Sequence, residues 1–407
     1  MSQPSPCLPL SELELRWAKA RRALAERAPE AGGLLVFSRM HVFWFSGTLA
    51  MGAFWLPLTG EPLLLCRKGL ERARLESAAP RQAAYRSFKD LPGLAAAAGS
   101  PLPEVVAVEM AGLTWEMGGM LSARLPQVRF VAGDAALARA QAVKTPYEME
   151  ILRRCGAAHH ASLHDVLPGR IRPGMTERDI AHAAWAVFFE HGHMGHMRMQ
   201  NFGEEIFLGH VSAGESGNYP SAFNGPLGLV GEHPAVPMMG SAARVWEPGQ
   251  VLACDIGFSL EGYCTDKTQL YFAGPASALP AEVRRAQDFC MAVQARAAEM
   301  LRPGRTPAAI WAEALRMSDA AGMNEGFMGL GGNKVPFLGH GIGLAIDTWP
   351  PLARGFDEPL EPGMAFALEP KQGIPGRGMV GVENTFEVTA SGGVCLTGDH
   401  YDILCLG

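Results

Sequence analysis

The first part of the chain alternates short apolar segments with stretches in which apolar residues recur at helical spacing. The helical stretches cover residues 68–78 and 113–125. The apolar segments are typical of buried strands and cover residues 33–38, 62–66, 105–109 and 128–131. We therefore predict a small α/β domain that occupies residues 1–143.

The N-terminal segment predicts an amphipathic helix that is capped near Ser11. It lacks the apolar core of a signal peptide, and no apolar run elsewhere reaches the roughly 18 residues of a membrane span. The net charge of −6 gives no reason to expect nucleic acid or an anionic membrane as partner. The eight cysteines form no CxxC pair, so we expect reduced thiols in a cytoplasmic protein.

The pattern of expected helices and strands changes after this first region. A long helix is expected to begin at Thr145, because Pro146 suits the first helical turn. Paired helices and strands with glycine-rich turns follow it along the chain. This pattern predicts an α+β domain over residues 144–407.

This second domain contains two similar segments. The segment IRPGMTERDIA at 171–181 resembles LRPGRTPAAIWA at 301–312, with Thr176 and Thr306 as the expected helix N-caps. A chance similarity of two helix starts is one interpretation. We favour a duplicated helix-plus-strand module folded about an approximate two-fold axis, with a cleft between its halves.

Acidic residues within apolar strands suggest where the chemistry lies. Asp255 and Asp266 are eleven residues apart, and a glycine turn between them predicts a hairpin that carries both acids on one side. Glu369 and Glu383 flank KQGIPGRG, which predicts a second hairpin with one acid on each arm. His340 lies between glycines, which allow the backbone to approach closely.

A buried ionised acid must be neutralised or bound to a cation. Taken singly, Asp266 and Glu383 are also consistent with the solvent face of a strand, and His340 with a hydrogen-bonded core histidine. Together, four acids and one imidazole predict a site for two divalent ions such as Mn, Fe, Co or Zn. Two ions roughly 3.5–4 Å apart can hold a hydroxide nucleophile and stabilise an oxyanion.

These segments resemble the pita-bread metallohydrolases, the family of methionine aminopeptidase, Xaa-Pro aminopeptidase, prolidase and creatinase. The resemblance covers nearly the whole chain, with a creatinase-like N-terminal domain. It rests on the motifs AVKTPYEMEILRRCGAAHH, PGMTERDIA, DIG, GYCTD, GHGIGL, ALEP and VENTFEVT. It implies that Asp255 and Asp266 bind the first ion, that His340 and Glu369 bind the second, and that Asp266 and Glu383 bridge both. It also implies a homodimer.

The chain departs from the peptidase pattern around this predicted cage. Two histidines expected from the resemblance are replaced by Met238 and Asp347, and two arginines by Gln269 and Gly381. Positioned imidazoles contribute strongly to rate, so other side chains must compensate in an active peptidase. The candidates are His233, Asp347 and a group made of His191, His193 and His196. We favour a solvated loop for that group.

The segment HGIGLAIDTWP also resembles pita-bread dimethylsulfoniopropionate lyases, in which an aspartate after the metal-binding histidine serves as base. Asp347 matches that aspartate. The lyases carry a further metal-binding aspartate where this chain has Gly257, so the resemblance is incomplete.

Three functional hypotheses follow. The first is an Xaa-Pro peptidase that acts on small peptides, with an altered substrate preference. The second is a small-molecule lyase or amidohydrolase, either lyase-like or creatinase-like, with Asp347 as base. The third is a non-catalytic binding protein, which predicts a lost ligand, whereas the five predicted ligands are all present.

Overall fold

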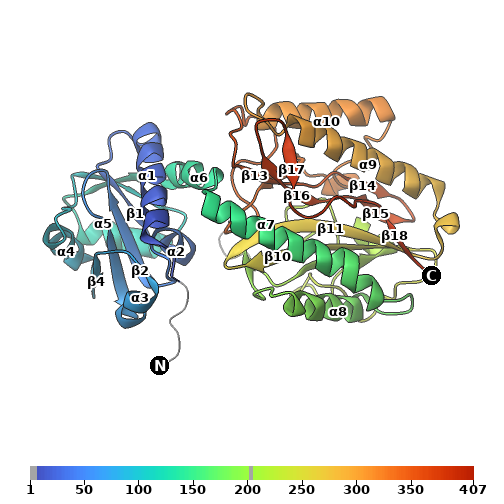
Figure 1. Ribbon diagram of the computed structural model, residues 1–407, viewed down its shortest axis with the longest axis horizontal. Helices are drawn as coiled ribbons and strands as arrows, with labels where there is room; N and C mark the ends of the chain where they lie inside the picture. The colour runs from blue at the N-terminus through green and yellow to red at the C-terminus, as the bar shows by residue number, and fades with distance from the viewer. Residues whose placement is uncertain (1–6, 201–204) are drawn as a thin grey trace. The chain divides into compact units, whose positions relative to one another are not determined.

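The computed structural model describes residues 7–200 and 205–407, which form two units (Figure 1). The first unit ends at Gln141, and the second spans Ala142–Gly407. The cysteines in the described ranges form no disulfide, and five of them are buried, as expected for core thiols. No helix in the same ranges is long and apolar enough to cross a membrane.

A six-stranded mixed sheet organises the first unit, in the strand order β4-β3-β2-β1-β5-β6. The central strand β1 pairs antiparallel with β2 and parallel with β5. The strands are β1 (Gly33–Val36), β2 (Met51–Pro57), β3 (Leu63–Lys68), β4 (Gln82–Ala84), β5 (Val105–Val108) and β6 (Arg129–Ala132). The helices are α1 (Leu10–Arg27), α2 (Arg39–Ser46), α3 (Leu70–Glu76), α4 (Leu91–Ala97), α5 (Trp115–Arg124) and α6 (Asp134–Ala142).

The four predicted strands of this unit are present as β1, β3, β5 and β6, and the two predicted helices as α3 and α5. The prediction missed β2 and β4. It was also wrong about the first helix cap, because α1 begins at Leu10 after Pro9 and Ser11 lies inside its first turn. A buried cluster that includes Leu35, Trp55 and Val106 forms the core.

Two four-stranded sheets and two pairs of helices build the second unit. Figure 1 shows α9 and α10 along one side of these sheets and α7 and α8 along the other. The helices are α7 (Pro146–His160), α8 (Glu177–Glu190), α9 (Ala281–Met300) and α10 (Pro307–Ala321). The sheet β18-β11-β10-β9 contains β9 (Gly209–Ala213), β10 (Val251–Leu260), β11 (Tyr263–Ala273) and β18 (Leu404–Leu406).

The second sheet of this unit has the order β12-β13-β16-β17. Its strands are β12 (Gly339–Gly341), β13 (Ala365–Leu368), β16 (Asn384–Val388) and β17 (Gly393–Cys395). The described residues of this unit also form two small antiparallel sheets, one of β7 (Met197–Arg198) and β8 (Glu205–Ile206) and one of β14 (Lys371–Ile374) and β15 (Gly378–Gly381).

The helix starts of the second unit agree with the sequence. Thr145 caps α7 and forms a reciprocal capping box with Glu148, and Thr176 caps α8 in the same way. Thr306 caps α10, with a proline in the first turn. Each pair of helices packs on its own buried cluster, one including Phe188 and the other including Phe386, as two copies of a module should.

Candidate metal centre

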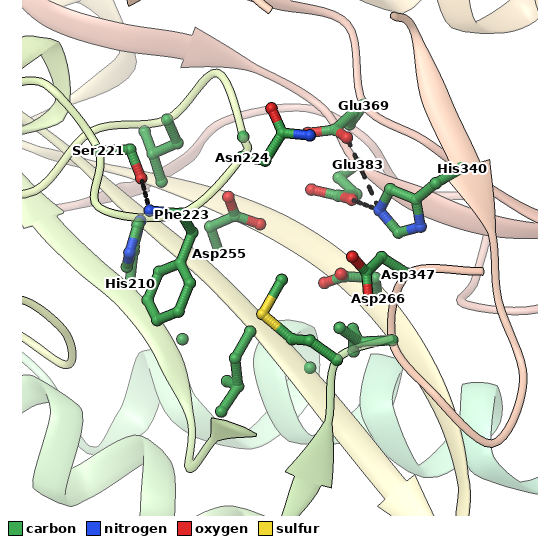
Figure 2. Close-up of a pocket in the computed structure, with 17 residues that line it drawn as sticks. His210, Ser221, Phe223, Asn224, Asp255, Asp266, His340, Asp347, Glu369 and Glu383 are labelled. Carbon is green, nitrogen blue, oxygen red and sulfur yellow. Dashed lines mark hydrogen bonds and ion pairs between the residues drawn. The ribbon is translucent and has the colours of Figure 1, made fainter. Parts of the chain in front are cut away.

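The five side chains predicted as metal ligands line one pocket. Asp255 lies on β10, Asp266 on β11 and His340 on β12, whereas Glu369 precedes β14 and Glu383 follows β15. Figure 2 shows His340 turned toward the two glutamates, with Asp255 and Asp266 nearby. The two sheets therefore contribute different members of a single cluster.

The β10–β11 hairpin fixes the relation between the two aspartates. Asp255 is opposite Thr268, and Asp266 is opposite Gly257, so the acids are offset by two positions along the ladder. Side chains two residues apart in a strand point to the same face. The Thr268 hydroxyl donates to Oδ1 of Asp255 at 2.7 Å, which orients that carboxylate. The predicted hairpin and the shared face of both acids are confirmed.

His340 presents a nitrogen to the acids. Its Nε2 lies 3.7 Å from Oε1 of Glu369 and 3.9 Å from Oε1 of Glu383. Its Nδ1 donates a hydrogen bond to the carbonyl oxygen of Gly341 at 3.1 Å, and this contact leaves Nε2 as the nitrogen that can bind a metal ion. Ligand atoms of Asp266, His340 and Glu383 all lie within 4.8 Å of one another.

The electrostatics of the cluster are uneven. Burial, reinforced by the nearby Asp255, raises the pKa of Asp266 to about 7. Burial likewise raises the pKa of Glu369 and, together with Asp266, the pKa of Glu383. The positive charge near these three acids does not offset the cost of their burial, so the donor set at the His340 end fits a divalent cation.

Asp255 behaves differently, because a lysine that the sequence interpretation overlooked lies beside it. Burial would raise the pKa of Asp255, but the ammonium of Lys371 lowers it overall. Lys371 Nζ lies 2.6 Å from Oε2 of Glu383, 3.3 Å from Oδ2 of Asp255 and 3.5 Å from Oε2 of Glu369. A lysine two residues after Glu369 in an apolar hairpin was the available signal.

The two catalytic candidates have different locations. Asp347 lines the pocket, and its Oδ1 accepts the amide of Gln200 at 2.8 Å. His233 is exposed in a turn, where its Nδ1 accepts a hydrogen bond from the amide of Ala235. Among the described residues, His233 is not one of those that line the pocket. The structure therefore brings only Asp347 to the predicted ligands.

A second imidazole reaches the pocket from β9, where the sequence interpretation did not look for one. His210 is opposite Asp255 in the β9–β10 ladder and packs against Phe223, with the two ring centroids 5.6 Å apart. Burial lowers the pKa of His210, and its Nε2 has no hydrogen-bond partner among the described residues. Figure 2 shows His210 on the side of the pocket away from His340.

The solvated-loop interpretation of the three clustered histidines is wrong for His193. This side chain is buried against Phe188 and Phe258, and its Nδ1 accepts the amide of Ser259 at 3.0 Å. Burial lowers the pKa of His193 to about 4, as expected for a neutral core imidazole.

The position at which the lyases carry an additional aspartate has no space for one here. A Cβ built on Gly257 would lie 2.5 Å from Cδ1 of Ile346 and 2.6 Å from Sδ of Met197. A larger residue would require both side chains to move. The packing therefore weakens the resemblance to the lyases.

Two family models together cover most of the chain. The model described as Metallopeptidase family M24 matches residues 150–390, and the Creatinase/Prolidase N-terminal domain matches residues 16–143. The chain belongs to metallopeptidase family M24. The predicted resemblance to the pita-bread metallohydrolases and the prediction of a metal-dependent hydrolase are thereby confirmed.

Relatives of this M24 protein extend over nearly its full length. It is 28% identical over 400 residues to a protein named probable dipeptidase PepE from Mycobacterium tuberculosis, with 94% of this chain and 95% of the relative covered. It is 23% identical over 368 residues to the Xaa-Pro dipeptidase of Pyrococcus furiosus, with 90% and 93% covered.

Solved structures agree with the fold of this M24 chain. Dipeptidase PepE from Mycobacterium ulcerans has a TM-score of 0.78 at 24% identity, covering 98% of this chain and 100% of the other. The Xaa-Pro dipeptidase from Bacillus anthracis has a TM-score of 0.79 at 20% identity, covering 97% and 100%. The predicted pita-bread architecture with a creatinase-like N-terminal domain is therefore confirmed.

Proposed function

We propose that this M24 protein is a metal-dependent dipeptidase that hydrolyses short peptides with proline after the scissile bond. The observation that carries the proposal is the convergence of Asp255, Asp266, His340, Glu369 and Glu383 on one buried pocket. Relatives that span nearly the whole chain are named dipeptidases or Xaa-Pro dipeptidases, which supports the substrate class.

The residues around the cluster suit a small peptide. Apolar side chains of Met199, Phe223, Leu227 and Ile346 line the pocket, and such walls accommodate a pyrrolidine ring. A divalent ion, when bound, supplies positive charge that polarises the peptide carbonyl and activates a water molecule. The oxygen-rich donor set with one imidazole suits Mn, Fe, Co or Zn.

Two polar side chains complete this proposed site. His210 lines the pocket, and its Nε2 has no hydrogen-bond partner among the described residues. We assign to His210 the contact with the peptide that the histidine replaced by Met238 would make in the related peptidases. Asp347 lines the same pocket with a carboxylate that a backbone amide orients, so it can accept a proton from the reacting groups.

The test is an assay of Mn- or Co-loaded protein on matched panels of Xaa-Pro and Xaa-Ala dipeptides and tripeptides. We expect the Xaa-Pro dipeptides to be preferred by about 10- to 200-fold in kcat/KM, the range that pocket fit supports. A Glu383→Gln variant is the matched inactive control. Absence of turnover on all Xaa-Pro peptides, with metal bound, would refute the proposal.

A further inference from the structure

Lys371 occupies an unusual position for a lysine. Its side chain is 1% exposed, and its ammonium lies within 3.5 Å of oxygens from three carboxylates. The side chain begins at the first residue of β14, directly opposite Gly381 on β15. A Cβ at Gly381 would lie 3.2 Å from Cγ of Lys371 and 2.7 Å from its Cα, so the glycine leaves room for the lysine stem.

The two glutamates divide their oxygens between Lys371 and His340. Oε2 of each glutamate faces the ammonium, at 2.6 Å for Glu383 and 3.5 Å for Glu369. Oε1 of each glutamate faces Nε2 of His340, at 3.9 Å for Glu383 and 3.7 Å for Glu369. One side of the acid cluster therefore already faces the lysine ammonium, whereas the other side faces an imidazole nitrogen that can bind a metal ion.

Both oxygens of Asp255 are engaged within the protein. Oδ1 accepts the hydroxyl of Thr268 at 2.7 Å, and Oδ2 lies 3.3 Å from the ammonium of Lys371. Asp266 belongs instead to the group with His340 and Glu383, whose ligand atoms lie within 4.8 Å of one another. The two aspartates of the hairpin thus have different partners: Asp255 lies beside the Lys371 ammonium, and Asp266 lies in the group that can hold a metal ion.

The charges around Asp255 agree with this division. The four acids carry four negative charges when ionised, and a buried cluster of that charge requires compensation. One lysine and one divalent ion neutralise three of these charges. A second divalent ion beside Asp255 would have to approach the Lys371 ammonium closely, because that ammonium lies 3.3 Å from Oδ2 of Asp255, and two cations repel each other strongly in a buried site.

We propose that the Lys371 ammonium takes the place of one of the two ions predicted from the sequence, so that the centre binds a single divalent ion. Asp266, His340, Glu369 and Glu383 hold that ion, and Asp255 pairs with Lys371. The inference rests on the proposed function in assuming a metal-dependent enzyme. The number of bound ions tests the inference, whereas peptide turnover tests the function.

The experiment counts ions on the full chain. Protein that has been stripped of metal is titrated with Mn²⁺ in a calorimeter, and the dialysed complex is analysed for metal content. We expect one ion per chain in the wild type and two in Lys371→Met, which removes the charge while keeping the length of the side chain. Lys334→Met, which removes an exposed lysine outside the pocket, should still bind one ion.

Electron paramagnetic resonance of the Mn²⁺ complex gives an independent measurement. We expect the wild type to show the spectrum of an isolated ion and Lys371→Met that of two exchange-coupled ions. Two ions in the wild type would overturn the proposal, since Lys371 would then only orient Asp255. A Lys371→Met variant that folds and still binds one ion would overturn it as well.

The two aspartates give a test that does not depend on the lysine variant folding. Asp255→Asn should retain one ion, because that side chain pairs with Lys371, whereas Asp266→Asn should lose it. Loss of the ion in Asp255→Asn at unchanged thermal stability of the apoprotein would contradict the assignment.

Discussion

At the scale of single residues, His210 and Asp347 matter most outside the acid cluster. Both line the pocket, one from β9 and the other from the segment after β12, and neither belongs to the predicted ligand set. The roles proposed for them concern the substrate and its protons. Their loss should therefore be visible in kinetics while metal binding is retained.

We expect Asp347→Asn to lower kcat by about 100-fold or more, the usual contribution of a positioned acid or base. The asparagine carbonyl can still accept the Gln200 amide, so the local fold and the metal content should not change. His210→Asn should instead raise KM more than it lowers kcat. Steady-state kinetics with parallel metal analysis measures both effects.

An exposed acid provides the control for this pair. Asp357→Asn removes the same charge from the surface and should leave both parameters unchanged. Wild-type kcat in Asp347→Asn would eliminate Asp347 as the base and, with it, the lyase-like hypothesis.

The acids and His340 were singled out from the sequence, but Lys371 and His210 were not. An acid in an apolar strand demands a cation, so its chemistry is visible from local composition. A lysine beside a hairpin turn is ordinarily solvated, and a single histidine on an apolar strand is ordinarily a core residue. Only the tertiary contact of Lys371 with Asp255, which lies on a different sheet, reveals its role.

At the scale of elements, a buried ion pair fastens α2 to the end of β5 in the first unit. Glu109 accepts the amides of Phe37 and Ser38 at 2.8 and 2.9 Å and lies 2.5 Å from Nδ1 of His41. Burial would raise the pKa of Glu109, but His41 and Ser38 lower it to about 2. Burial would lower the pKa of His41, but Glu109 raises it.

These shifts fix the pH range in which the pair stabilises the unit. The contribution of Glu109 is present above its ordinary pKa of 4.5 and is lost as the pH falls toward 2. The contribution of His41 is complete below its ordinary pKa of 6.5 and is lost as the pH rises through its raised value. Both contribute fully only between these two ordinary values.

We expect Glu109→Gln to destabilise the first unit by about 3–5 kcal/mol, because it leaves a buried pair broken. The difference from wild type should be large at about pH 5.5 and small near pH 2. Hydrogen exchange of peptides from α2 and β5 measures it, with the exposed Glu116→Gln as control. An equal difference at both pH values would show that the charge of Glu109 is unimportant.

The elements themselves were largely predictable where one signal dominated. Thr145, Thr176 and Thr306 predicted three helix starts, because a threonine directly before a helical pattern is strongly favoured as an N-cap. The strand β2 was missed although MGAFWLP is as apolar as the predicted strands, because periodicity alone does not distinguish a short apolar run from a buried helix segment. The short edge strand β4 is defined only by its pairing with β3.

At the scale of the whole molecule, metal should stabilise the two units unequally. The proposed ligands all belong to the second unit, which has its own buried clusters. Removal of metal by a chelator should therefore destabilise that unit by about 2.7 kcal/mol relative to protein at a free ion concentration about 100 times Kd. Hydrogen exchange resolved by peptide measures both units in one experiment.

Peptides from the first unit serve as the internal reference in that measurement. Their exchange should not respond to the chelator. A response of equal size in both units would mean that the ion acts through the whole chain, and an absence of response in the second unit would deny it a structural role.

The contact between Thr268 and Glu383 bears on how the proposed metal site is assembled. These residues form a backbone bridge between the hairpin that carries the aspartates and the segment that carries the last glutamate. Each repeat thus contributes an incomplete set of donors. With the proposed ligand set, the ion can bind only after both repeats have folded and docked in register, so a chain in which either repeat is unfolded should not hold it.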